Sequence, residues 1–266
     1  LRRLLRIQEL TNEGVSLLGV VRFLEMEDRL DDAQRDALAE LALQAGIPVA
    51  ETQGGKGALV WDHPCNVGAI GVTGSSAANA LVRAADLIIG IGTRLQDFTT
   101  GSRALIDASQ RKLVQINVAS YDAHKHGAMS VIGDARVSID ALRQSLRGWS
   151  VRDEWRSTIA SRTAEWNAAC EAALTPSRSL PSDAQVIGTV WRAADADAVV
   201  VCAAGGLPGE LHKLWRTRAP GGYHVEYGYS CMGYEIAGAL GAKMAEPGRE
   251  VHVMVGDGSY LMLNSE

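Results

Sequence analysis

The stretch that decides the fold is Val251-His252-Val253-Met254-Val255-Gly256-Asp257-Gly258-Ser259. Its first half is a short, mostly apolar run, typical of a buried parallel strand. A glycine-rich turn follows at the carboxyl end, where open α/β sheets bind their ligands. The glycines let the backbone turn tightly, and Asp257 offers a hard oxygen ligand to a Mg²⁺ ion that also binds phosphate. Gly-Asp-Gly is also common in ordinary turns, so its context decides between these interpretations.

Two upstream segments supply that context. The apolar strand at 199–202 runs into Ala203-Ala204-Gly205-Gly206 and then a helix, which is either an ordinary connection or a phosphate site at a helix N-terminus. Further along, Gly233, Ala237 and Gly241 are spaced four apart. On a helix they form one small-residue face, which indicates either close approach of another element or simply tight packing.

The whole chain alternates strands with helices, which predicts an α/β fold of two parallel-sheet, doubly wound domains. Ser182 and Gln185 match a capping box and restart ordered structure after a proline-containing linker. We expect a first domain at 1–150, a helical segment and linker at 151–182, and a second domain at 183–266. The expected helices are 30–45, 77–85, 134–147, 152–174, 209–215 and 232–245, and the expected strands are 47–50, 86–92, 112–118, 131–132, 199–202, 223–225 and 251–255.

Composition narrows the function classes. The 266 residues are 47% hydrophobic and 21% charged, as in a soluble globular protein, and a net charge of -5 disfavours nucleic-acid and anionic-membrane partners. The four cysteines form no metal-type pair, so we interpret them as reduced packing residues of a cytoplasmic protein. His124 and His126 lack a nearby carboxylate cluster and are expected to be solvated, and His63 is expected to belong to a loop.

The three glycine-containing segments, in this order and spacing, resemble the cofactor domain of thiamin-diphosphate enzymes related to acetolactate synthase. The resemblance implies thiamin diphosphate and Mg²⁺ as cofactors. The family's Gly-Leu-Gly-Thr-Met-Gly is matched by Gly228-Tyr229-Ser230-Cys231-Met232-Gly233. The resemblance implies that Asp257 is the metal ligand and that Met232 is the apolar wedge under the bent cofactor. It also implies that the Ser230 carbonyl contacts the aminopyrimidine. The implied diphosphate contacts are Gly205, Gly206, Gly256, Gly258 and Ser259.

Sequence strings in the first domain indicate which branch of the thiamin-diphosphate enzymes the chain resembles. Glu51-Thr52-Gln53-Gly54-Gly55-Lys56-Gly57, Trp61-Asp62-His63-Pro64 and the string 66–74 resemble the middle domain of the trihydroxycyclohexanedione hydrolases. That branch hydrolyses 3D-(3,5/4)-trihydroxycyclohexane-1,2-dione to 5-deoxy-D-glucuronate in myo-inositol catabolism, so a small cyclic dione is the implied substrate. The resemblance covers about 45–266. Residues 1–30 are interpreted as out of register with the family.

The resemblance also implies that part of the enzyme lies outside this chain. The family's activating glutamate belongs to an N-terminal domain and acts across a homodimer interface, so no catalytic residue is expected here. The second Mg²⁺ ligand, an asparagine, would follow Glu266, since Asn264 is too close to Asp257 to replace it. We therefore expect the second domain to be truncated, and the isolated chain to be inactive and to bind thiamin diphosphate weakly.

Two alternatives stay open at this stage. The chain could be a fragment of another thiamin-diphosphate enzyme, such as acetolactate synthase or a carboligase. It could also be a non-catalytic module that binds FAD or another nucleotide and carries Gly-Asp-Gly by coincidence, in which case it would retain flavin and show no Mg²⁺ dependence.

Overall fold

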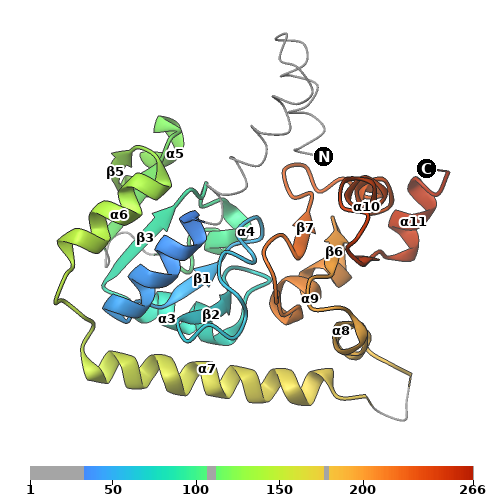
Figure 1. Ribbon diagram of the computed structural model, residues 1–266, viewed down its shortest axis with the longest axis horizontal. Helices are drawn as coiled ribbons and strands as arrows, with labels where there is room; N and C mark the ends of the chain where they lie inside the picture. Colours follow the sequence, from blue (N-terminus) through green and yellow to red (C-terminus); the bar gives the residue numbers. More distant parts are fainter. Residues whose placement is uncertain (1–32, 107–111, 177–179, 266) are drawn as a thin grey trace, which may run out of the picture.

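The computed structural model describes residues 33–106, 112–176 and 180–265 (Figure 1). The prediction for residues 1–30 and part of the predicted linker, 177–179, lie outside the described residues. All strand pairs within them are parallel, as the alternating pattern predicts. No described helix is long and apolar enough to cross a membrane.

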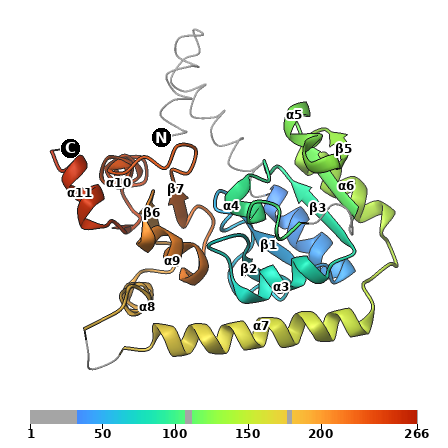
Figure 2. The same ribbon diagram turned by 180° about the vertical axis from the view of Figure 1, so that it is seen from behind.

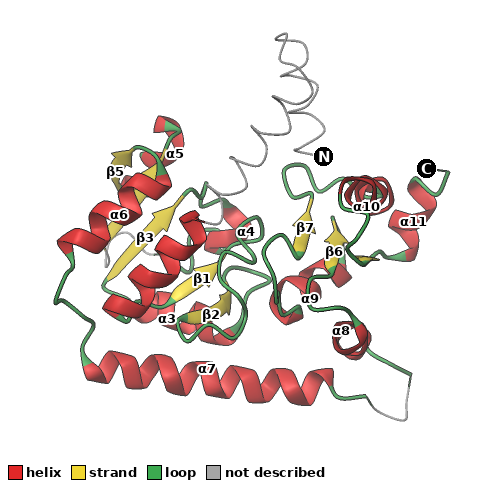
Figure 3. Cartoon of the chain, in the orientation of Figure 1, coloured by secondary structure: helices red, strands yellow, loops and turns green. Residues whose placement is uncertain are grey.

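The first domain contains two small parallel sheets flanked by helices (Figure 3). One pairs β1 with β2, and the other has the order β3-β4-β5. β2 was not predicted, because Asn-Val-Gly-Ala lacks an apolar run. The elements after the helix at 33–45 are β1 (Val49–Glu51), β2 (Asn66–Ala69), α3 (Ser76–Ala84), β3 (Leu87–Ile91), α4 (Asp97–Thr100), β4 (Lys112–Asn117), α5 (Ser120–Ala123), the 3₁₀ turn η1 (Lys125–Gly127), β5 (Met129–Ile132) and α6 (Ala135–Ser145).

The second domain is built around β6 (Val199–Cys202), which is buried along its whole length. Its sheet has the order β7-β6-β8, with β7 at Tyr223–Val225 and β8 at Val251–Val253. Side chains of β6 alternate between two apolar clusters, so that Val200 packs with α8 and α9 while Val201 packs with α10. The helices are α8 (Asp183–Ala193), α9 (Gly206–Leu214), α10 (Tyr234–Ala245) and α11 (Asp257–Met262).

A single long helix, α7 (Asp153–Leu174), joins the two domains. In both views it runs beneath the first domain, and its C-terminal end reaches the second (Figure 1, Figure 2). Ile159 on α7 belongs to the first domain's apolar core. Cys170 and Leu174, near its end, belong to the core of the second. The helix expected at 152–174 is therefore present. One end packs into the core of the first domain, and the other end packs into the core of the second.

A chain of buried polar side chains also crosses between the domains. Tyr223 donates its hydroxyl to the Gln53 carbonyl oxygen at 3.0 Å, and the Gln53 amide donates to the Thr73 hydroxyl at 3.1 Å. That hydroxyl lies 2.9 Å from Nδ1 of His212, which is fully buried on α9. Buried polar groups need hydrogen-bond partners. These hydrogen bonds are therefore made only when Gln53 and Thr73 of the first domain lie in one position relative to Tyr223 and His212 of the second.

Some sequence predictions need correction. The small-residue face is in close contact only at one end: a methyl group added at Gly233 would lie 2.7 Å from Leu263, whereas Ala237 is exposed and a methyl group added at Gly241 would meet open space. α10 packs instead through Ala239 against β6. Of the four cysteines, Cys231 is exposed and is not a packing residue.

The histidine segment is only partly as expected. His124 is exposed, but His126 is half-buried, with Nε2 at 2.9 Å from the Leu95 carbonyl oxygen. His63 lies in a loop, where its Nδ1 accepts the backbone N–H of Cys65.

Candidate cofactor site

The three segments predicted to bind the cofactor follow three neighbouring parallel strands. Gly205 and Gly206 come after β6, residues 226–233 after β7, and residues 256–259 after β8. Parallel strands place their carboxyl ends at the same edge of a sheet, and the arrowheads of β6 and β7 point the same way in Figure 3. Because β6 lies between the other two, its turn is flanked by both of the other segments.

The glycine turns leave room for an anion. α9 begins at Gly206, preceded by Gly205 with φ of 114°, a conformation that L side chains rarely adopt. A methyl group added at Gly206, Gly256 or Gly258 would meet nothing within 4 Å. The first N–H groups of a helix have no intrahelical partner, so the turn after β6 can supply donors to a phosphate.

Asp257 lies at the start of α11, directly after the β8 turn. Its side chain is exposed, and its Oδ1 accepts the N–H of Gly258 at 2.8 Å. Within the described residues, no group of three or more acidic, histidine or cysteine side chains surrounds a metal position. A Mg²⁺ ion on Asp257 would thus take further oxygens from elsewhere, as ions shared with a diphosphate do.

Ser259 differs from the other predicted contacts because it is buried within α11. The sequence predicts a glycine-rich turn at Gly-Asp-Gly-Ser. In the structure the turn is the N-terminus of a short helix, Asp257–Met262.

The segment between β7 and α10 holds the other predicted contacts. Ser230 adopts a left-handed backbone with φ of 54°, and Met232 is 45% exposed. Non-glycine residues pay steric strain in that region. Ser230 stands where the Gly-Leu-Gly-Thr-Met-Gly pattern has its second glycine, so a residue that does not favour the left-handed conformation adopts it here.

Two acidic residues beside this loop were missed by the sequence analysis. The Glu226 carboxylate accepts the backbone N–H groups of Tyr229 at 2.9 Å and Cys231 at 2.6 Å. Glu235, fully buried on α10, accepts the N–H of Gly233 at 2.8 Å. Their position at the two ends of the loop was visible in the sequence, but the N–H groups they reach depend on the folded loop.

Electrostatics favour an ionised Glu226. Burial raises the pKa of its carboxyl group, but hydrogen bonds from the N–H groups of Cys231 and Tyr229 outweigh burial and lower the pKa below its ordinary value. Glu226 is therefore a charged acceptor at neutral pH, and charge-assisted hydrogen bonds are stronger than neutral ones.

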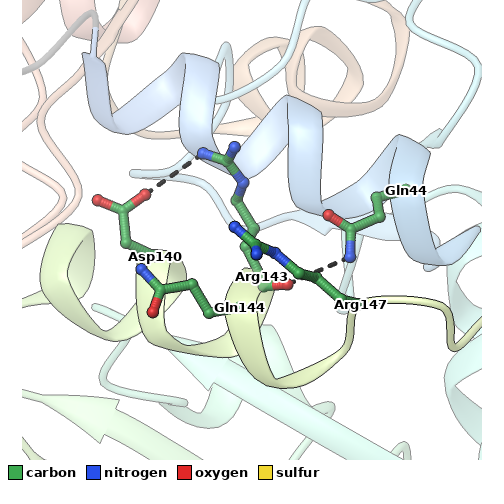
Figure 4. A pocket seen from close by; sticks show the side chains of 5 residues that line it. All are labelled: Gln44, Asp140, Arg143, Gln144 and Arg147. Carbon is green, nitrogen blue, oxygen red and sulfur yellow. Dashed lines mark hydrogen bonds and ion pairs between the residues drawn. The ribbon is translucent and has the colours of Figure 1, made fainter.

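A surface pocket lies elsewhere, in the first domain between the helix at 33–45 and the end of α6 (Figure 4). Arg143 in this pocket pairs with Glu40 and Asp140, so its charge is already compensated. The pocket contains no predicted cofactor residue; it is lined by Gln44, Asp140, Arg143, Gln144 and Arg147.

Comparison with known families identifies both domains. The central domain of thiamine pyrophosphate enzymes matches residues 29–142, and their C-terminal TPP binding domain matches residues 203–266. Together these matches span about two thirds of the chain. The chain belongs to the thiamine pyrophosphate enzymes. Thiamine pyrophosphate (thiamin diphosphate), bound with Mg²⁺, is accordingly its cofactor, and the expected fold of two α/β domains is confirmed.

Two curated relatives with high similarity carry the name of the same hydrolase. The chain is 42% identical over 255 residues to 3D-(3,5/4)-trihydroxycyclohexane-1,2-dione hydrolase of Clostridium perfringens, covering 87% of this chain and 40% of that protein. It is 43% identical over 274 residues to a hydrolase of the same name from Bacillus cereus, covering 93% and 41%. The chain thus spans about two fifths of the length of the relatives it matches.

Proposed function

We propose that this thiamine pyrophosphate enzyme is part of a hydrolase that opens 3D-(3,5/4)-trihydroxycyclohexane-1,2-dione to 5-deoxy-D-glucuronate, in the breakdown of myo-inositol. The observation that carries the proposal is the meeting of three predicted cofactor segments at the carboxyl edge of the β7-β6-β8 sheet. The name shared by the relatives supports the substrate, a small cyclic dione.

The proposed site assigns a role to each segment. Asp257 would hold Mg²⁺, while the N–H groups around Gly205, Gly206, Gly256 and Gly258 would receive the diphosphate. Open space beside three of these glycines supports this fit. Ser259 would support the turn from within α11, where it is buried. Ser230 would offer its carbonyl to the aminopyrimidine, and Met232, partly exposed, would support the bent cofactor.

The reaction consumes one water, and the carbon–carbon bond between two neighbouring carbonyl groups breaks to leave a carboxylate and an aldehyde. Bound thiamin diphosphate supplies nucleophilic carbanion chemistry at a carbonyl carbon. The residues of this chain bind and orient the cofactor. We propose that the activating glutamate comes from another domain across a homodimer interface, and that the enzyme works in the cytoplasm without nucleic-acid or membrane partners.

Calorimetric titration tests the cofactor assignment. Thiamin diphosphate is titrated into the chain with and without Mg²⁺, beside Asp257→Ala and the matched control Asp153→Ala on α7. Binding that requires Mg²⁺ and is lost in Asp257→Ala alone is expected. Equal binding by both variants would remove Asp257 from the site, and retention of FAD without Mg²⁺ dependence would favour the nucleotide-binding alternative.

A chimera tests the substrate. The region of the Clostridium perfringens hydrolase that aligns with this chain is replaced by the chain, and turnover of the dione is compared with turnover of pyruvate. Dione hydrolysis is expected, since the chain would supply the cofactor domain of the same reaction. A chimera that binds thiamin diphosphate but condenses pyruvate, leaving the dione untouched, would instead support a synthase or carboligase.

A further inference from the structure

The loop between β7 and α10, residues 226–233, is held at one end by the carboxylate of Glu226 and at the other by that of Glu235, in the first turn of α10. Glu226 is anchored to the sheet, because its own N–H donates to the Cys202 carbonyl oxygen on β6 at 3.3 Å. From this point its two carboxylate oxygens reach forward to the N–H groups of Tyr229 and Cys231. One side chain thereby closes a ring of backbone that contains Ser230.

Glu235 holds the other end from inside the protein. It is fully buried in the first turn of α10, and its Oε2 accepts the N–H of Gly233. Its Oε1 is buried and has no hydrogen-bond partner among the described residues. Burying a carboxylate with so few partners is unfavourable, and such costs are expected where a residue serves function rather than stability.

Apolar packing holds the α10 end of the loop, where Leu263 lies against Gly233 and Tyr234 stacks on His224, but contributes little in the middle of the loop. Tyr229 is 92% exposed, and Met232 is nearly half exposed. The ring of Tyr227 meets the edge of Phe98 on α4, with centroids 5.8 Å apart, and is the loop's aromatic contact with the first domain. Ser230 holds an unfavourable left-handed conformation. Hydrogen bonds to the two carboxylates help to offset that strain and to fix the backbone, beside the backbone bond from the Tyr234 N–H to the Cys231 carbonyl oxygen.

We propose that Glu226 and Glu235 are positioning residues that hold residues 227–233 in the conformation that receives thiamin diphosphate. The inference rests on the proposed function, because it takes the Ser230 carbonyl and the Met232 side chain as cofactor contacts. Both contacts lie within the span that the carboxylates hold. A loop that occupies the receptive conformation only a fraction of the time binds with an affinity reduced by that fraction.

The test combines cofactor binding with a measurement that needs no cofactor. Glu226→Ala, Glu226→Gln and Glu235→Gln are compared with Glu246→Gln, a matched change at the far end of α10 whose carboxylate pairs with Arg249. Amide hydrogen exchange of Tyr229, Cys231 and Gly233 is followed without cofactor, and the Kd for thiamin diphosphate is measured calorimetrically with Mg²⁺.

For Glu226→Ala we expect faster exchange at Tyr229 and Cys231 and a Kd about tenfold higher, which corresponds to a loop that is receptive about a tenth of the time. Glu226→Gln retains an acceptor oxygen and should fall between wild type and Glu226→Ala. Glu235→Gln should retain slow exchange at Gly233, and a Glu235→Ala variant that still folds should lose it. The thermal midpoint of Glu226→Ala should stay near wild type, since this side chain is not in the core.

Two results would overturn the proposal, and they differ from failure of the proposed function. Unchanged exchange in Glu226→Ala would show that the carboxylate does not hold the loop. Faster exchange with an unchanged Kd would show that the loop does not receive the cofactor. If wild type shows slow exchange at these amides but binds no thiamin diphosphate at millimolar concentration, the proposed cofactor site on this chain is wrong, and the inference falls with it.

Discussion

Lowering the pH from about 8 to about 5 is expected to destabilise this protein through one buried residue, His212. The imidazole is fully buried on α9, and its Nδ1 contacts the Thr73 hydroxyl of the other domain. Burial, together with the nearby positive charge of Lys56, lowers the pKa of His212 from its ordinary 6.5 to about 3. The folded protein therefore keeps this side chain neutral at a pH where the unfolded chain protonates it.

The sign and size of the change in unfolding free energy with pH follow from proton linkage. Between pH 6.5 and about 3 the unfolded state binds more protons at His212, so the free energy of unfolding falls as the pH falls and is level above 6.5. The limiting slope is about 1.4 kcal/mol per pH unit, which amounts to about 2 kcal/mol at pH 5. For a protein of ordinary stability this is a substantial fraction of the total.

Urea denaturation followed by tryptophan fluorescence measures this effect at several pH values. The informative quantity is the difference in unfolding free energy between wild type and His212→Asn, which should shrink by about 2 kcal/mol between pH 8 and pH 5. Thr73→Val is the matched control: it removes the contact with His212 but keeps its burial, so it should retain the pH dependence. A wild-type to His212→Asn difference that stays constant over this range would refute the reasoning.

Three further predictions concern local stability, each measured by urea denaturation. Ser230→Gly should stabilise the protein by up to about 1 kcal/mol by relieving the left-handed strain, and no gain would show that the loop carries none. Gly188→Ala should cost about 1–3 kcal/mol, because its methyl group would lie 2.8 Å from the Leu174 Cβ and carbonyl oxygen; a neutral change would mean that α7 and α8 separate freely. Ser182→Ala should cost about 1 kcal/mol by breaking the capping box with Gln185, and a loss below a few tenths would argue that α8 does not depend on this cap.

Local features of the fold could be predicted from the sequence. The apolar run 199–202 forms β6, because a short continuous apolar run is typical of a buried parallel strand, and the helix expected at 152–174 is present as α7. The capping box at Ser182 forms as predicted, since its two hydrogen bonds join residues three apart. Errors occurred where the local signal was weak: β2 has no apolar run, and the helical continuation after Gly256 follows a glycine-rich turn.

By itself, the sequence determined the α/β class and the strand–turn–helix segments, because each depends on neighbours along the chain, while the candidate cofactor residues came from the resemblance of its motifs to the thiamin-diphosphate enzymes. Only the tertiary structure decided which groups meet. The order β7-β6-β8 brings three separate turns to one edge of the sheet. The fold also places the carboxylates of Glu226 and Glu235 within hydrogen-bond distance of the N–H groups of Cys231 and Gly233. His212 meets Thr73 across 139 positions of sequence. Contacts of this kind depend on the packing of whole elements, which no local pattern encodes.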